Sequence, residues 1–269
     1  MLKYLIAILV VLFPLNAFAD LLVLQHGYQG RADDWRRSGI VKRLVAAGWQ
    51  DAGTPVYSRQ HGRWLRLPAA RPEGRWLVTL QMPSDAPLVQ QAGRLTEVLQ
   101  QLSEGRDEAL ILVGHSAGGV AARLALVRAQ QHLPVSQLIT IASPHSGVEL
   151  AGIGARVATG PVGDMAAMLG LGGLTGAAQL FRDLAPESEG NLLYRLNRQP
   201  HPRIDYVSLV REGANGLPGD WLVPPASQRM ESVPALARMA RSVSTPPGHA
   251  LRAADAELLL QLISGPRRL

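Results

Sequence analysis

Short runs of apolar residues, each followed by a segment of helical spacing, recur along this chain and restrict its possible folds more than any other feature. Strands that are apolar on both faces are typical of a parallel sheet with helices on both sides. The pattern therefore predicts an α/β fold with about six mostly parallel strands. The expected strands are residues 21–25, 76–81, 109–113, 137–142, 204–210 and 239–245, and the expected helices are residues 34–48, 85–102, 120–131 and 250–263.

The composition limits the chemistry that such a sheet can carry. The 269 residues are 47% hydrophobic and 18% charged, and they include no cysteine. A chain this apolar is not intrinsically disordered. Without cysteine it has no disulfide, no thiolate nucleophile and no cysteine-ligated metal. Catalysis would have to come from serine, histidine and carboxylates, or from a metal held by histidine and aspartate.

The first 19 residues, MLKYLIAILVVLFPLNAFA, have the features of a secretory signal peptide. Lys3 precedes an uncharged run, and Ala17-Phe18-Ala19 supplies a small–x–small cleavage site. The apolar run, which Pro14 interrupts, is short for the roughly 20 residues that a membrane-spanning helix needs. We predict that residues 1–19 are removed and that the domain of residues 20–269 works in the periplasm or outside the cell. An uncleaved membrane anchor is the alternative.

Residues 147–200 interrupt the alternation and form an insertion between two expected strands. The only charges in residues 147–181 are Glu149, Arg156 and Asp164, among many glycine, alanine, methionine and leucine residues. Asp164 and the glycines argue against a membrane span. One interpretation is an apolar cap over the carboxyl edge of the sheet, where open α/β sheets bind ligands. Extra helices that complete the core are the other.

Residues 114–118 read Gly-His-Ser-Ala-Gly and match the G-x-S-x-G pattern. They come directly after an expected strand and before an expected helix, which is the setting of a nucleophile elbow. Small neighbours let the turn adopt strained backbone angles, and the helix N-terminus offers N–H donors to a developing negative charge. We predict that Ser116 is a nucleophile. A glycine-rich turn with an idle serine is the alternative.

A serine nucleophile needs an acid and then a base later in the chain. His249 stands in a Pro-Pro-Gly turn between the last strand and the last helix, where the base is expected. Asp220 lies in the loop after the expected strand 204–210, and Glu212 directly follows that strand. A carboxylate there can accept a hydrogen bond from the far imidazole nitrogen. We predict Asp220 as the acid, with Glu212 as the alternative.

An oxyanion formed during the reaction needs two backbone N–H donors. The residue after the nucleophile, Ala117, supplies one of them in this architecture. The second is expected in the loop after the first strand, which reads His-Gly-Tyr-Gln-Gly from residue 26 to residue 30. We predict Tyr28 for this donor, with Gln29 as the alternative, and a structural role for His26.

The formal net charge is +6, and the densest basic stretch covers residues 59–75. It contains five arginines, with Trp64 among them and Tyr57 and Trp76 beside them. Such a segment can contact nucleic acid or an anionic membrane surface. No nucleic-acid-binding module is recognisable, and an exposed hairpin or loop is the simpler interpretation.

Taken together, these residues resemble the α/β-hydrolase superfamily, and within it the bacterial triacylglycerol lipases and inositol-deacylase-like esterases. The resemblance rests on the segments LLVLQHGYQG, ILVGHSAGGVAARLAL, LITIASPHSGVEL, GDWLVPPAS and PPGHALRAADAELLLQLI. It implies an α/β-hydrolase fold with Ser116, Asp220 and His249 as nucleophile, acid and base. It also implies an oxyanion hole at Tyr28 and Ala117. The resemblance spans most of the chain after residue 19, with the expected cap and residues 51–75 unmatched.

The resemblance implies a secreted esterase or lipase that cleaves carboxylic esters through an acyl-enzyme and needs no cofactor. Some secreted lipases of this kind carry a structural Ca²⁺ ion, but no loop of closely spaced carboxylates is visible here, and no metal is expected. The expected partner is an ester or lipid substrate, a membrane or lipid surface is a further candidate, and nucleic acid is not expected. A membrane-anchored phospholipase or acyltransferase of the same fold is one alternative. A non-catalytic hydrolase-fold binding protein is another.

Overall fold

The computed structural model describes residues 21–69, 74–105, 109–129, 132–149, 174–213 and 219–265. The expected leader lies outside these residues, as do residues 150–173 of the insertion. A seven-stranded sheet with the order β2-β5-β1-β6-β7-β8-β9 runs through the molecule, and all its neighbouring strands are parallel. Its strands are β1 (Leu21–Gln25), β2 (Gln50–Asp51), β5 (Trp76–Leu80), β6 (Leu110–His115), β7 (Val135–Ile141), β8 (Asp205–Arg211) and β9 (Ala240–Thr245).

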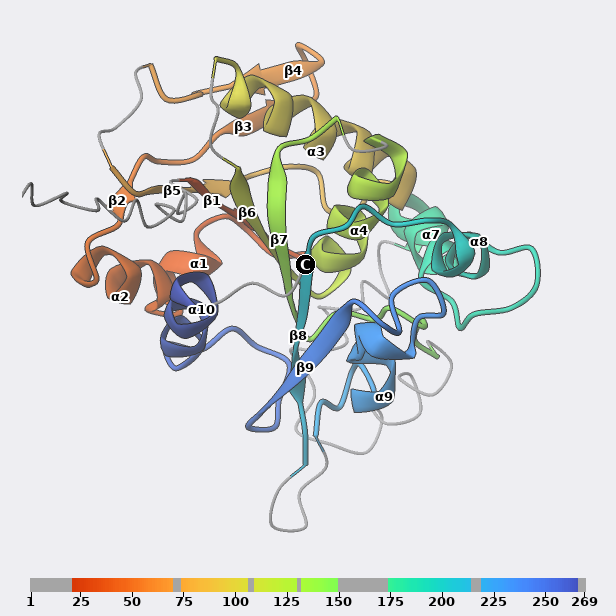
Figure 1. The fold of residues 1–269 in the computed structure, drawn as a ribbon. Helices are drawn as coiled ribbons and strands as arrows, with labels where there is room; N and C mark the ends of the chain where they lie inside the picture. Colours follow the sequence, from red (N-terminus) through yellow and green to blue (C-terminus); the bar gives the residue numbers. More distant parts are fainter. Residues whose placement is uncertain are drawn as a thin grey trace, which may run out of the picture.

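Helices cover both faces of this sheet, and a separate antiparallel hairpin joins β3 (Val56–Ser58) to β4 (Arg63–Leu65) (Figure 1). One face carries α1 (Asp34–Arg37), α2 (Ile40–Ala46) and α10 (Asp255–Ser264). The other carries α3 (Leu88–Ser103), α4 (Ala117–Ala129), α7 (Leu174–Asp183) and α8 (Leu192–Arg198). The short helices α9 (Pro225–Gln228) and η1 (Met230–Ser232) connect β8 to β9.

Alternate side chains of each central strand enter two separate cores. In β1, Leu21 and Val23 pack on the α3–α4 side, whereas Leu22 and Leu24 pack on the α2–α10 side. Both faces of the strand are therefore buried, which is why the sequence shows continuous apolar runs instead of an alternating pattern. The prediction of an α/β fold with six parallel strands is confirmed, and the two-residue β2 adds a seventh strand at the edge.

Three expected helix boundaries were wrong for local reasons. The helix expected at residues 34–48 is divided into α1 and α2, because Gly39 has a φ of +85° and ends the first helix. α4 begins directly at Ala117, closer to Ser116 than the hydrophobic spacing indicated. α10 begins only at Asp255, whose carboxylate accepts the N–H of Arg252 at 2.8 Å and closes a turn before the helix.

The described part of the insertion is joined to the core. Four leucines of this part are buried in the core on the α3–α4 side. One lies in α7, one directly after it and two in α8, namely Leu180, Leu184, Leu193 and Leu196. The Asp183 carboxylate accepts the N–H of Leu88 at 2.9 Å and so caps the first turn of α3. This part of the insertion therefore contributes to the core, whereas residues 150–173, which the sequence allowed either as a cap or as core helices, lie outside the described residues.

Among the described residues, no helix combines the length and apolarity needed to cross a membrane.

Candidate active site

The candidate site lies at the carboxyl edge of the sheet, between β1 and β6. The chain leaves β1 toward helices on one face and leaves β6 toward α4 on the other face. The two loops therefore diverge and open a crevice, which is where open α/β sheets bind ligands. The loop after β1 carries Tyr28, and the turn after β6 carries Ser116.

Ser116 occupies a strained turn between β6 and α4. Its φ is +52°, a left-handed value that L-residues other than glycine seldom adopt. Glycines let the two loops approach each other: a Cβ on Gly118 would lie 2.3 Å from the carbonyl oxygen of His26, and one on Gly27 would lie 2.8 Å from the Cβ of Ser116. The turn therefore holds the Ser116 side chain at the edge of the sheet, beside the loop after β1.

The side chains of Ser116, His249 and Asp220 form a hydrogen-bonded chain. Ser116 Oγ lies 3.0 Å from His249 Nε2, and His249 Nδ1 lies 2.7 Å from Asp220 Oδ2. A carboxylate only accepts hydrogen bonds, so Nδ1 carries the proton and Nε2 is left to accept one from the Ser116 hydroxyl. All three side chains are buried. This arrangement can turn a serine hydroxyl into a nucleophile.

Both oxygens of the Asp220 carboxylate are fixed. Oδ1 accepts the backbone N–H groups of Leu222 at 2.8 Å and of Val223 at 3.0 Å. Oδ2 accepts from His249 and also from Nε2 of the buried Gln228 at 3.2 Å. The orientation of the carboxylate, and through it that of the imidazole, is therefore set by four donors.

Two backbone N–H groups are available beside Ser116. One belongs to Ala117, the first residue of α4. The other belongs to Tyr28, in a turn closed by the N–H of Gly30 to the carbonyl of Gly27 at 3.1 Å. The segments that carry the two donors lie against each other. Gly27, which precedes Tyr28, is so close to Ala117 that a Cβ on it would lie 3.4 Å from the Ala117 nitrogen. Neither N–H has an acceptor within the described part of the chain, so both remain candidate donors of an oxyanion hole.

Comparison with known proteins agrees with this architecture. A model of the PGAP1-like alpha/beta domain family matches residues 79–152, which include β6, the Ser116 turn and α4. The lin2722 gene product of Listeria innocua superposes with a TM-score of 0.60 at 14% identity, over 92% of this chain and 90% of that chain. The chain has the α/β-hydrolase fold. The superfamily resemblance drawn from the sequence is thus confirmed at the level of the fold.

Two further solved structures with this α/β-hydrolase arrangement are larger than the present chain. Bacillus licheniformis lipase BlEst2 in its propeptide form has a TM-score of 0.60 at 15% identity, with 92% of this chain and 51% of that chain covered. Phospholipase PlaB from Legionella pneumophila has a TM-score of 0.56 at 12% identity, with 92% and 60% covered. Such low identities show the fold alone. No curated protein sequence matches the chain.

A cleft of about 710 Å³ opens onto Ser116 and His249. Its apolar wall is formed by Tyr28, Trp221, Leu222 and Leu251. The Trp221 ring meets the His249 ring edge-on, with 6.3 Å between the centroids. Polar side chains at the cleft include Gln29, Asp34, Arg37, Ser38 and Arg252. A volume of this size is typical of sites that enclose small organic ligands.

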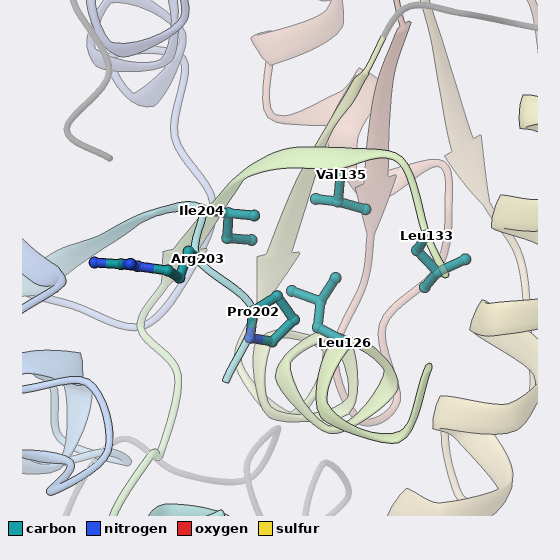
Figure 2. A pocket seen from close by; sticks show the side chains of 6 residues that line it. All are labelled: Leu126, Leu133, Val135, Pro202, Arg203 and Ile204. Atoms are coloured by element: carbon teal, nitrogen blue, oxygen red, sulfur yellow. The ribbon is translucent and has the colours of Figure 1, made fainter. Parts of the chain in front are cut away.

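A second cavity of about 240 Å³ lies at the opposite edge of the sheet, near the amino ends of β7 and β8. Figure 2 shows its aliphatic lining and the Arg203 side chain pointing away from the other labelled side chains. Its lining residues are Leu126, Leu133, Val135, Pro202, Arg203 and Ile204. None of them is a nucleophile, a general base or a general acid. The cleft at Ser116 is therefore the candidate for chemistry.

The alternatives that the sequence left open have other contacts. Glu212 pairs with Arg229 and accepts from the Ser244 hydroxyl at 2.8 Å. His26 is buried and bonds through Nδ1 to the carbonyl of Gly27 at 2.9 Å, and burial lowers its pKa. In the described residues no three histidine, aspartate or glutamate side chains form a group that could hold a metal.

Two side chains that the sequence did not indicate, the partly buried His115 and the buried Arg211, hold the loop of His249. His115 Nε2 contacts the carbonyl oxygen of His249 at 2.9 Å, and Arg211 Nη2 donates to the carbonyl of Ala250 at 3.0 Å. Burial, followed by the neighbouring His249, lowers the pKa of His115 to about 3. His115 is therefore neutral near pH 7 and donates from Nε2. No sequence signal pointed to either residue, because their partners are 134 and 39 positions away.

Arg211 is itself held by a buried, bidentate ion pair with Asp255, with both N–O distances at 2.7 Å. The Asp255→Asn variant is expected to lower the free energy of unfolding by about 3–5 kcal/mol, because it leaves a buried guanidinium without a counter-charge. Urea denaturation measures this change. The matched control on the same helix is Glu257→Gln, which removes an exposed pair with Arg43 and should cost less than about 1 kcal/mol. Equal losses in the two variants would contradict the assigned role of the buried pair.

Proposed function

We propose that this protein is a serine hydrolase that cleaves carboxylic esters through an acyl-enzyme. The observation that carries the proposal is the Ser116–His249–Asp220 hydrogen-bonded chain, with distances of 3.0 and 2.7 Å, at the floor of a largely apolar cleft. The lipase and the phospholipase among the similar structures support it. An ester with an apolar acyl group suits the cleft best, because aromatic and aliphatic side chains form one wall.

In the first half of the reaction, Ser116 attacks the carbonyl carbon of the ester. His249 Nε2 takes the hydroxyl proton as the Oγ–C bond forms, and Asp220 stabilises the resulting imidazolium. The carbonyl oxygen becomes an oxyanion, which accepts the N–H groups of Tyr28 and Ala117. When the tetrahedral intermediate collapses, the C–O bond to the alcohol breaks and His249 returns the proton to the departing oxygen.

Water completes the cycle. It enters the position of the alcohol and gives a proton to His249 Nε2 while its oxygen attacks the acyl carbon. The second tetrahedral intermediate uses the same two N–H donors. Its collapse releases the carboxylic acid and returns the proton to Ser116 Oγ. No redox step or cofactor enters these steps, and atoms and charge balance at each of them.

We further propose that residues 1–19 direct export and that the enzyme acts in the periplasm or outside the cell. The sequence of the leader supports this location. The mass of the purified protein tests it, since cleavage after Ala19 leaves a chain that begins at Asp20. A full-length mass would favour the membrane-anchored alternative.

The acyl chain is expected to occupy the cleft beside Trp221 and Leu251. A buried methylene contributes about 0.8 kcal/mol, so kcat/KM should rise up to about fourfold per added methylene until the cleft is filled. The measurement is kcat/KM on p-nitrophenyl esters from acetyl to palmitoyl. A maximum at acetyl would contradict this location of the acyl chain. Failure to hydrolyse any member of the series would reject the ester hydrolase itself.

A further inference from the structure

A basic hairpin that the proposed chemistry does not use stands at the surface. β3 and β4 pair antiparallel and lie over α3 (Figure 1). Three arginines and one histidine of the hairpin are exposed. They lie in the turn, in β4 or directly after β4, and are Arg59, His61, Arg63 and Arg66. The hairpin that the sequence favoured for this basic stretch is thus present, and its positive charges face solvent.

The hairpin is fixed to the body of the protein by aromatic side chains. The Tyr57 and Trp64 rings meet edge-on with centroids 5.6 Å apart, and Trp64 Nε1 donates to the carbonyl of Arg94 at 2.9 Å. The Arg94 guanidinium lies 4.6 Å from the centre of the Tyr57 ring. The N–H of Tyr57 also donates to the carbonyl of Gln81 at 2.8 Å. The arginines therefore project from an anchored platform.

This platform adjoins the loops that form the cleft. β5 lies beside β1 in the sheet, and the loops that follow them are joined by the N–H of Ala32, which donates to Gln81 Oε1 at 2.9 Å. Arg59 of the hairpin pairs with Asp85 in the loop after β5. The hairpin is therefore linked to the loop that carries Tyr28 through the loop after β5.

We propose that this hairpin is the surface with which the protein binds anionic lipid membranes. The inference rests on the proposed function, because a membrane would present lipid esters beside the cleft. Arg63 and Arg66 have no ion-pair partner in the described part of the chain, so their charges are available to lipid phosphates. Val45 and Val89 are the exposed large hydrophobic side chains among the described residues, so the attraction is electrostatic. Screening by salt should weaken it.

The test measures sedimentation of the Ser116→Ala variant with vesicles, so that binding is read without turnover. One set of vesicles is phosphatidylcholine, and the other contains equal parts of phosphatidylcholine and phosphatidylglycerol. We expect binding to the anionic vesicles alone, weakening as salt is raised. Each arginine near an anionic surface strengthens binding about fivefold. Adding both Arg63→Gln and Arg66→Gln to the Ser116→Ala variant should therefore weaken its binding to the anionic vesicles by roughly 30-fold.

The matched control adds Lys42→Gln and Arg128→Gln instead, which remove the same charge from exposed positions on α2 and α4. Unchanged thermal unfolding of both double variants shows that they are folded. Equal losses of binding in the two, or no preference for anionic vesicles, would overturn the proposal. So would stronger binding of a single-stranded oligonucleotide than of vesicles at the same salt. Failure of the wild type to hydrolyse esters would reject the proposed function. The vesicle experiment would still test membrane binding, because it does not depend on turnover.

Discussion

The Ser116→Ala variant is expected to lose about 10⁵-fold or more of kcat/KM on p-nitrophenyl esters, as removal of the nucleophile does in enzymes with this triad. Alanine has no hydroxyl to give a proton to His249 Nε2 and no oxygen to carry the acyl group. Backbone strain is not increased, because alanine tolerates the φ of +52° about as poorly as serine does. The second readout is labelling by a fluorophosphonate, which should add mass to the wild type and not to the variant.

Ser38→Ala is the matched control for this experiment. Ser38 lines the same cleft, but its hydroxyl donates to the carbonyl of Trp35 at 3.1 Å and has no contact with His249. This variant should keep nearly all the activity and still take the label. Full activity in Ser116→Ala would show that another group performs the chemistry. A wild type that neither hydrolyses esters nor takes the label would leave the non-catalytic binding protein as the better interpretation.

The central strands of the sheet were predictable because a strand that is buried on both faces has a continuous run of apolar residues. β1 and β6 have to supply apolar side chains to two cores at once, so each appears as a continuous apolar run. β2 leaves no such trace: Gln50 and Asp51 are exposed, and the pairing of this edge strand with β5 depends on backbone groups that no side-chain pattern reports. Sequence reasoning therefore finds six of the strands, including β9 at one edge, and misses the two-residue strand at the other edge.

The three residues of the hydrogen-bonded chain were accessible from the sequence because their order along the chain is tied to the fold. Ser116 follows a buried strand, and His249 lies in the turn before the last helix. Arg211 and Gln228 have no such signal. Each is a buried polar side chain that acts through a hydrogen bond to a group that folding brings close. Arg211 donates to the carbonyl of Ala250, and Gln228 donates to the carboxylate of Asp220. The sequence around each residue does not show which group it contacts in the folded protein.

The sequence also left two carboxylates open as the acid, since both follow β8. Folding separates them through a single loop closure, in which the N–H of Asp220 donates to the carbonyl of Arg211 at 3.1 Å. That bond returns Asp220 to the carboxyl end of the strand, where its side chain reaches His249. Glu212 instead pairs with Arg229. Spacing alone cannot report which of the two carboxylates such a closure selects.

The Asp220→Asn variant should lower kcat/KM by about 10⁴-fold at neutral pH. The two backbone donors at Oδ1, Leu222 and Val223, would hold the amide oxygen of the asparagine in that position. Its NH₂ group would then occupy the place of Oδ2 and face His249 Nδ1. An NH₂ group only donates, so Nδ1 would have to accept and the ring proton would move to Nε2. His249 could then no longer take the proton of Ser116.

Glu212→Gln is the comparison that separates the two candidate acids. Its carboxylate and the Arg229 guanidinium are each 33% exposed, and such pairs contribute at most about 1 kcal/mol to stability. With no contact to His249, the substitution should leave kcat/KM within about twofold of the wild type, because the proton path through Asp220 is intact. Both variants are measured on one ester at one pH, with thermal unfolding beside them. A severe loss in Glu212→Gln and a mild one in Asp220→Asn would assign the acid to Glu212 and would mean that the 2.7 Å contact between Asp220 and His249 does not orient the base.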